Sequence, residues 1–349
     1  MSDELSTAVE EADDVPLARH RVLRWSDLPP TVRAEIEATA GARVVAETPY
    51  PASSVSQVAS LLELEDGARY FVKATRVTDS PAVIARYRAE VYVARHLPRA
   101  MPTPRLAWAL RDEDWGMVAF EVVDGRAPAT PWDPDELDLV LVALETAASL
   151  PGAREARLAP AGPELADLAT GWRSLRDDPE PDLARLVPWA ADHLDALVEA
   201  ERGVLVACEG ESFVHGDVRA DTLVLTPSSA LLVDWAYASR GAPWLDLAMF
   251  LPGVVVQGVA DVVEPVPVTA DAARRARGGA WAAATFDAHP LGRGVHPADV
   301  RSVVAGLAGY YLHHARRPAP PGLPHLRASQ RAQGAAAVAW LEQIGLCDG

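Results

Sequence analysis

Two short apolar segments of this sequence each end in a carboxylate, and a loop separates them. Residues 213–217 read FVHGD and end in Asp217, while residues 231–234 read LLVD and end in Asp234. Phosphoryl transfer uses such a pair, because one carboxylate accepts or orients the acceptor hydroxyl and another holds a Mg²⁺ ion that bridges nucleotide phosphates. Asp217 and Asp234 are therefore the candidate residues for this chemistry.

The single lysine of the chain, Lys73, stands in an apolar run, YFVKA, that reads as a strand. The other 31 basic residues are arginines, and the sequence contains no asparagine. Where arginine is used so heavily, a lone lysine indicates a position that the planar guanidinium does not fit. The following segment has apolar residues at helical spacing and carries Glu90, which can pair with Lys73 and hold its ammonium against nucleotide phosphates.

The segment around Lys73 is predicted to form a small antiparallel sheet with one helix. Alternating apolar and polar residues indicate strands over 42–51, 57–65 and 68–77, with Asp66-Gly67 as a hairpin turn. The helix is expected over 81–97, after which come two short strands, 105–114 and 115–123, and a turn at Asp124-Gly125.

After Gly125 the sequence is predicted to be mainly helical. The expected helices are 133–150, which Asp133 caps, 188–203, which Gly203 ends, and most of 243–343 apart from a Pro/Gly-rich interruption at 316–324. Residues 160–185 read as loop or short helix, and a short hairpin carries the two acidic motifs. The order predicts two unequal lobes, a connector near 121–126 and a ligand bound between the lobes.

Composition narrows the classes of function. Acidic residues outnumber basic ones 49 to 32, for a net charge of −17, which excludes a protein that grips nucleic acid along a basic face and leaves room for cationic partners. Two cysteines, Cys208 and Cys347, form no disulfide framework, so a reducing compartment is expected. No apolar stretch has the length of a membrane helix, and the acidic N-terminus is not a signal peptide. We therefore expect a cytoplasmic protein with no membrane partner.

The motifs HGD at 215–217 and VDW at 233–235, with WAYASRGAPWLDLAMF at 235–250, resemble a known family. The sequence is similar to the aminoglycoside phosphotransferases and choline-kinase-like enzymes over about residues 45–343. This resemblance implies an α+β, two-lobed protein-kinase-like fold with a small antiparallel-sheet N-lobe and a mainly helical C-lobe. The expected organisation is an acidic tail over 1–20, the N-lobe over 21–123 and the C-lobe over 124–349.

The resemblance also implies roles for individual residues. Asp217 corresponds to the catalytic base and Asp234 to a Mg²⁺ ligand. Asp246 corresponds to an aspartate that braces the catalytic loop. Lys73 and its helix partner Glu90 correspond to the pair that holds the nucleotide phosphates.

Further positions complete the expected site. The connector is expected to bind the adenine of ATP (or the base of GTP) through the carbonyl of Glu121 and the N–H of Val123. His215 and Arg219 are grouped with the catalytic residues; Arg219 either faces the γ-phosphate or is a solvated loop arginine. Asp246 is expected to give structural support.

The sequence departs from the family pattern at two places. The family has HGDxxxxN, whose asparagine binds Mg²⁺, and here Thr222 takes that position with a shorter and weaker oxygen ligand. The hairpin that covers the nucleotide, residues 51–58, has no glycine. Ser53 and Ser54 are its candidate phosphate-binding residues, because serine-rich turns still offer N–H groups.

The predicted function is transfer of the γ-phosphoryl group of ATP (or GTP), with Mg²⁺, to a hydroxyl of a small molecule such as an aminoglycoside-like or other alcohol. Two alternatives stay open: a kinase of peptide Ser/Thr, and a nucleotide-binding or scaffold protein with weak or no turnover, which Thr222 and the glycine-free hairpin motivate. The acidic run over 177–182 is either solvated surface or the rim of a pocket for a cationic acceptor. The sequence leaves the oligomeric state open.

Overall fold

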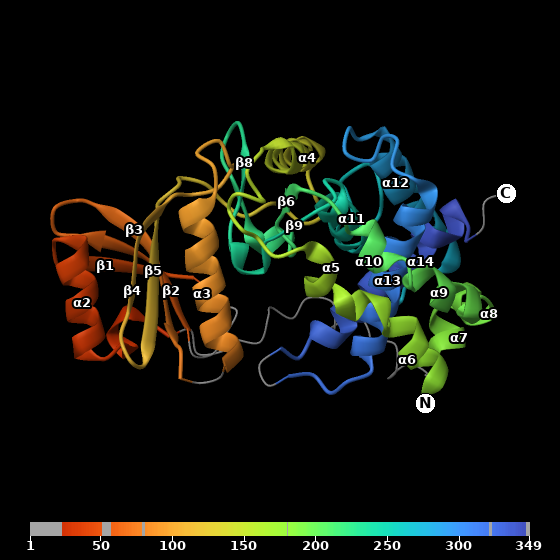
Figure 1. Ribbon diagram of the computed structural model, residues 1–349, viewed down its shortest axis with the longest axis horizontal. Helices are drawn as coiled ribbons and strands as arrows, with labels where there is room; N and C mark the ends of the chain where they lie inside the picture. The colour runs from red at the N-terminus through yellow and green to blue at the C-terminus, as the bar shows by residue number, and fades with distance from the viewer. Residues whose placement is uncertain (1–22, 51–56, 79–80, 180, 321–322, 347–349) are drawn as a thin grey trace, which may run out of the picture.

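The computed structural model describes residues 23–50, 57–78, 81–179, 181–320 and 323–346. The predicted acidic tail over 1–20 and the candidate residues Ser53 and Ser54 lie outside these residues. The described chain forms a small sheet-containing lobe and a larger helical lobe (Figure 1). The boundary after residue 123 remains a proposal.

The smaller lobe contains a five-stranded antiparallel sheet in the order β1-β2-β3-β5-β4. Its strands are β1 (Val44–Pro49), β2 (Gln57–Leu64), β3 (Arg69–Arg76), β4 (Leu106–Arg111) and β5 (Trp115–Glu121). The hairpin turn at Asp66-Gly67 is present, and Gly67 has the positive φ of +84° that such a turn requires. Strand β3 lies inside the sheet, where Val72 and Ala74 are buried on one face. Since side chains alternate along a strand, Lys73 points to the opposite face.

The described part of the sheet lobe carries two α-helices rather than the one that was expected. Helix α2 (Pro30–Ala40) begins with a proline at its first position and ends at Gly41, whose φ is +89°. It buries Val32 and Ile36, one helical turn apart, in a core that includes Val72. Helix α3 (Pro81–His96) stands between the sheet and the larger lobe (Figure 1), so it can carry side chains to the junction of the lobes.

The larger lobe is mainly helical, as predicted. Its longer helices are α4 (Pro134–Ser149), α6 (Gly171–Asp177), α9 (Leu194–Glu201), α11 (Leu245–Gln257), α12 (Ala272–Ala288), α13 (Pro297–Ala315) and α14 (Leu326–Ile344). Short helical turns are η1 (Trp25–Asp27) in the sheet lobe and, in the helical lobe, α5 (Ala161–Glu164), η2 (Ala166–Ala169), α7 (Leu183–Leu186), α8 (Pro188–Asp192), α10 (Val204–Ala207), η3 (Ala220–Thr222) and η4 (Trp235–Tyr237). The interruption between α13 and α14 coincides with the Pro/Gly-rich segment.

The single helix expected over 188–203 is wrong, because the segment is broken at His193 into α8 and α9. The Nδ1 atom of His193 lies 2.8 Å from the carbonyl oxygen of Trp189, four residues earlier. The backbone N–H of His193 bonds the carbonyls of both Trp189 and Ala190, which tightens the last turn. A side chain that competes with the backbone for a helix carbonyl disfavours a continuous helix.

Two short strand pairs in the helical lobe position the acidic motifs. Strand β6 (Ser212–Val214) pairs with β9 (Ser239–Gly241), and β7 (Leu223–Leu225) pairs with β8 (Ala230–Leu232). Asp217 follows β6 and Asp234 follows β8. The hairpin predicted from the sequence is therefore present as β7 and β8, and Asp234 follows it, whereas Asp217 follows a strand of the other pair. In the described ranges, no helix is long and apolar enough to cross a lipid bilayer.

Candidate active site

The side chain of Lys73 connects the two lobes. Its Nζ lies 2.6 Å from Oε1 of Glu90 on α3 and 3.2 Å from Oδ1 of Asp234 in the helical lobe. Lys73 and Glu90 are largely buried, with side chains 14% and 9% exposed. Burial alone would lower the pKa of Lys73, but the carboxylates of Glu90 and Asp234 outweigh it and raise the pKa above its ordinary value. The lysine is therefore protonated at neutral pH and holds a fixed positive charge at the junction of the lobes.

Asp234 has the chemistry and exposure of a metal ligand. It sits directly before η4 with a φ of +70°, a left-handed conformation that aspartate tolerates better than most residues. Its side chain is 36% exposed, so only part of the carboxylate is engaged by Lys73. Carboxylate oxygen suits Mg²⁺, which keeps several waters and phosphate oxygens as further ligands. In the described part of the chain, no group of three or more His, Cys, Asp or Glu residues is arranged to hold a metal ion.

The loop that carries Asp217 is tied to the start of α11 by Asp246. Its carboxylate accepts the backbone N–H of His215 at 2.6 Å and that of Gly216 at 2.9 Å. Burial raises the pKa of Asp246 to about 6, although the two hydrogen bonds favour its charged form. Gly216 has a φ of +82°, and an added Cβ would lie 2.7 Å from the carbonyl oxygen of Tyr237. The loop therefore needs both the glycine and the buried carboxylate to keep its conformation.

His215 lies between the two acidic motifs and is completely buried. Its Nε2 donates to the carbonyl of Val233 at 2.9 Å, and its Nδ1 accepts the N–H of Asp217 at 3.3 Å. Burial lowers the pKa of His215 to about 4, so the ring is neutral at neutral pH. The sequence grouped His215 with the catalytic residues, and the structure places its ring in the interior, where it links the backbones of two loops. We propose that it is a positioning residue.

Because the ring of His215 is buried and neutral, the free energy of unfolding should fall as the pH is lowered. The unfolded histidine has a pKa near 6.5 and the folded one near 4, so the stability it contributes is complete above pH 6.5 and is lost as pH falls toward 4. Replacing His215 with glutamine should reduce the loss of unfolding free energy between pH 7.5 and pH 5 by about 2 kcal/mol. Urea denaturation of both proteins at the two pH values measures this difference. Identical pH dependence would contradict a buried, neutral ring.

Asp217 is accessible and lies next to a guanidinium. Its side chain is 32% exposed, and its Oδ1 lies 3.4 Å from Nε of Arg219, which also lies 3.2 Å from Oδ1 of Asp221. Burial raises the pKa of Asp217, the charge of Arg219 opposes this, and the carboxylates of Asp221 and Asp234 add to it. The structure therefore brings Asp217, Asp234 and Lys73 into one electrostatic cluster. A carboxylate with a raised pKa is a better proton acceptor.

Thr222, expected as the second metal ligand, is engaged with the loop backbone. Its hydroxyl donates to the carbonyl of Asp217 at 2.9 Å and accepts the N–H of Arg219 at 2.9 Å. The residue is only 3% exposed. This geometry favours a role in holding the loop that carries Asp217.

Three residues near Asp217, namely Arg86, Tyr237 and Tyr311, were not predicted from the sequence as part of the site. Arg86 lies on α3 one turn before Glu90, and its guanidinium carbon stands 5.1 Å from the ring centroid of Tyr237. Both Arg86 and the partly buried Tyr311 interact electrostatically with Asp217. The spacing of Arg86 and Glu90 on one helix face was a usable signal for Arg86. Tyr311 had none, because an aromatic residue in an apolar helix reads as core.

The connector residues Glu121 and Val123 lie at the end of the last strand of the sheet lobe. Glu121 is the last residue of β5, pairs with Tyr70 on β3 and donates its N–H to the carbonyl of Arg105 at 2.8 Å. The N–H of Val123 has no hydrogen-bond partner among the described residues. A free backbone donor at this position suits recognition of a nucleotide base, so binding by Glu121 and Val123 stays a prediction.

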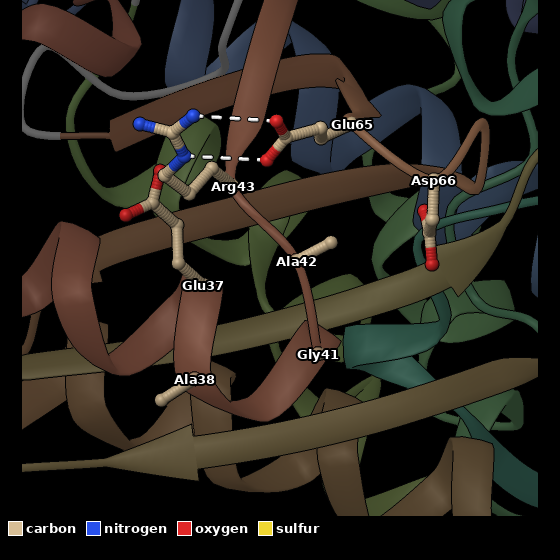
Figure 2. Close-up of a pocket in the computed structure, with 7 residues that line it drawn as sticks. All are labelled: Glu37, Ala38, Gly41, Ala42, Arg43, Glu65 and Asp66. Carbon is tan, nitrogen blue, oxygen red and sulfur yellow. Dashed lines mark hydrogen bonds and ion pairs between the residues drawn. The ribbon is translucent and has the colours of Figure 1, made fainter.

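An open pocket of about 490 Å³ lies at the other end of the sheet lobe and shares no residue with this cluster. Figure 2 shows it where α2 ends and β1 begins, with Arg43 and Glu65 paired by two hydrogen bonds of 3.3 Å. Both side chains are more than half exposed, and exposed ion pairs contribute little to stability or recognition. We therefore assign no function to this pocket.

Comparison with known proteins agrees with the geometry. The model of the phosphotransferase enzyme family matches residues 50–289. Among solved structures, the chain is similar to a macrolide 2'-phosphotransferase type I, with 15% identity and a TM-score of 0.54 over 88% of this chain and 97% of that one. At this identity the similarity shows a shared fold, which is the two-lobed α+β protein-kinase-like fold predicted from the sequence.

Two further solved structures are similar at TM-scores below 0.5. One is the amicoumacin kinase hAmiN in complex with AMP-PNP, Ca²⁺ and Ami, with 13% identity and a TM-score of 0.49 over 85% of this chain and 92% of that one. The other is choline kinase from Cryptosporidium parvum Iowa II, with 12% identity and a TM-score of 0.47 over 85% of this chain and 88% of that one. Among curated proteins, no significant match was found.

Proposed function

Because the chain belongs to the phosphotransferase enzyme family, we propose that it transfers the γ-phosphoryl group of ATP, or of GTP, to a hydroxyl group of a small molecule. The observation that carries this proposal is the position of Lys73 Nζ, between Glu90 at 2.6 Å and Asp234 at 3.2 Å. A buried, charged lysine held against a partly exposed carboxylate is the arrangement that binds a metal-loaded triphosphate. When bound, Mg²⁺·ATP supplies the phosphoryl group, and the ion offsets part of its negative charge.

Each residue of the site then has a distinct task. Lys73 binds phosphate oxygens, Glu90 keeps its ammonium in place, and Asp234 holds the metal. Asp217 orients the acceptor hydroxyl and accepts its proton, for which the raised pKa is favourable. The positive charge of Arg219 offsets part of the negative charge of the Asp217 carboxylate. Most of the rate acceleration in this scheme comes from positioning and charge neutralisation.

Three exposed carboxylates of the acidic run over 177–182 are each paired with an arginine. Asp177 lies 3.5 Å from Arg176, and Asp182 lies 3.2 Å from Arg185. Asp178 is paired with Arg316. Since these three carboxylates already face guanidinium groups, they are poorly suited to hold a polycation. We propose that the acceptor is a neutral or weakly charged alcohol.

The test is phosphorylation of a panel of neutral and cationic alcohols by the full chain with Mg²⁺ and ATP or GTP, detected by mass spectrometry of the product. We expect Mg²⁺-dependent formation of a phosphate ester on at least one neutral alcohol. Preference for polycationic acceptors would contradict the acceptor class. Absence of nucleotide binding in a thermal-shift titration would contradict the proposal itself, because a ligand of the folded state must raise its apparent stability.

A second candidate is a nucleotide-binding protein with weak or no turnover. The engagement of the Thr222 hydroxyl with the loop backbone favours it, because that leaves Asp234 as the one oxygen ligand of the expected pair still open to a metal. This candidate predicts stabilisation by Mg²⁺·ATP without phosphorylation of any acceptor. A peptide Ser/Thr acceptor is tested by adding peptides to the panel.

The free energies of unfolding of two Thr222 variants distinguish a role in holding the loop from a role in binding the metal. Replacing Thr222 with valine should cost about 2 kcal/mol of unfolding free energy, because the Arg219 N–H and the Asp217 carbonyl lose their partner in a buried place. Replacing it with serine keeps the hydroxyl and should recover most of that loss. Denaturation without metal or nucleotide measures both variants. A valine variant that keeps its stability but loses Mg²⁺ affinity would instead identify Thr222 as a metal ligand.

A further inference from the structure

A cavity of about 350 Å³ in the helical lobe is lined by four arginines. It lies where α7, α12, α13 and α14 meet the segment before α12, and it shares no residue with the candidate active site. The four guanidinium groups belong to Arg185, Arg275, Arg316 and Arg331, and the only carboxylate in the lining is that of Asp182. Such a concentration of positive charge is unusual in a chain with a net charge of −17.

The remaining lining is mostly apolar. It consists of Leu183, Leu186, Val268 and Leu312, with the hydroxyl of Thr269. Leu183 and Leu312 are buried. The cavity therefore combines an apolar wall with several convergent polar groups, which is the usual composition of a small-molecule site, and its volume falls at the small end of such sites.

Two of the four arginines, Arg275 and Arg331, form no ion pair with a described carboxylate, although the carboxylates of Glu342 and Asp271 act on Arg275 from a longer distance. Arg275 donates to the backbone carbonyls of Leu186 and Val268, but its Nε is buried without any hydrogen-bond partner. Arg331 forms no hydrogen bond or ion pair in this part of the chain. The other two arginines are compensated, Arg185 by Asp182 and Arg316 by Asp178.

We propose that this cavity binds a small organic phosphate monoester. Two guanidinium groups without an ion-pair partner match the two negative charges of a phosphate monoester, and guanidinium binds such oxyanions through parallel N–H donors. The apolar wall receives the organic part of the ligand. Bringing like charges together in a partly buried place is unfavourable until an anion offsets them. This proposal does not depend on the proposed phosphotransfer.

The test is calorimetric titration of the full chain with phenyl phosphate, in the presence of saturating Mg²⁺ and AMP-PNP so that the candidate active site is occupied. We expect one equivalent to bind, and inorganic phosphate to bind about fivefold more weakly because it lacks an apolar body. Replacing Arg331 with methionine should weaken binding of phenyl phosphate by about tenfold. Arg331 makes no hydrogen bond to a described residue, so this variant is expected to fold, and Arg185→Met, at an exposed side chain, provides a second variant.

The matched control is Arg293→Met, which removes an exposed arginine of the same lobe outside the cavity. Its affinity for phenyl phosphate should equal that of the unmodified chain. Absence of binding would overturn the proposal, as would equal weakening by Arg331→Met and Arg293→Met. Loss of binding when AMP-PNP is added would assign the anion to the active site and would also overturn it. Equal affinity for benzoate and phenyl phosphate would overturn the choice of a phosphate ester.

Discussion

Replacing Asp217 with asparagine should lower the rate of phosphoryl transfer by about a thousandfold and leave the affinity for Mg²⁺·ATP nearly unchanged. Asparagine keeps the size of the side chain and can still orient a hydroxyl, but it accepts no proton. The hydrogen bonds that shape the loop go to Asp246 and to the backbone of Asp217, so the loop should survive the change. Steady-state kinetics with the best acceptor, and a thermal-shift titration with Mg²⁺·ATP, measure the two quantities.

Asp221 provides the matched control for this substitution. It contacts the same guanidinium, with its Oδ1 3.2 Å from Nε of Arg219, but its side chain is 72% exposed. Asp221→Asn should change the rate by no more than about twofold, because an exposed ion pair contributes little. An Asp217→Asn variant that remains as active as Asp221→Asn would show that Asp217 is not the base. A variant that loses nucleotide affinity as well would show that Asp217 acts in metal binding.

The residues of the candidate site could be found in the sequence because their signals are local. Asp217 and Asp234 each follow an apolar run. An apolar run predicts a strand, so each aspartate was predicted to lie at the end of a strand. Lys73 stood out because no other lysine occurs. The contact between Lys73 and Asp234 joins two lobes, so no local signal in the sequence predicts it.

Other features were missed because they depend on tertiary contacts. Helix α2 is short, and its burial of Val32 and Ile36 against the sheet decides its conformation more than its own sequence does. The break at His193 depends on which carbonyl its ring bonds. The burial of His215 is a feature of the same kind, since the motif does not show that the ring is enclosed between two loops.

The other large expected effect concerns the charge-conserving substitution of Lys73 by arginine. The ammonium sits between two carboxylates, at 2.6 Å from Glu90 and 3.2 Å from Asp234, and the side chain is only 14% exposed. A guanidinium is larger and planar, so it must displace at least one of these carboxylates. Moving Asp234 by about 1 Å would misplace the metal site, and we expect a loss of about a hundredfold in kcat/KM.

Measuring the free energy of unfolding of Lys73→Arg and of a matched control variant shows whether position 73 requires the shape of lysine or only its positive charge. Lys73→Arg should cost about 1–3 kcal/mol of unfolding free energy, as overpacking of a buried site does. The reverse exchange, Arg69→Lys on the same strand, alters an exposed pair with Asp124 and should change stability by less than about 0.5 kcal/mol. If Lys73→Arg keeps both activity and stability, the position accepts either cation and the lone lysine carries no information about fit. If it loses both while Arg69→Lys loses neither, a compact ammonium is required where the two lobes meet, and the choice of residue is explained by the space between Glu90 and Asp234.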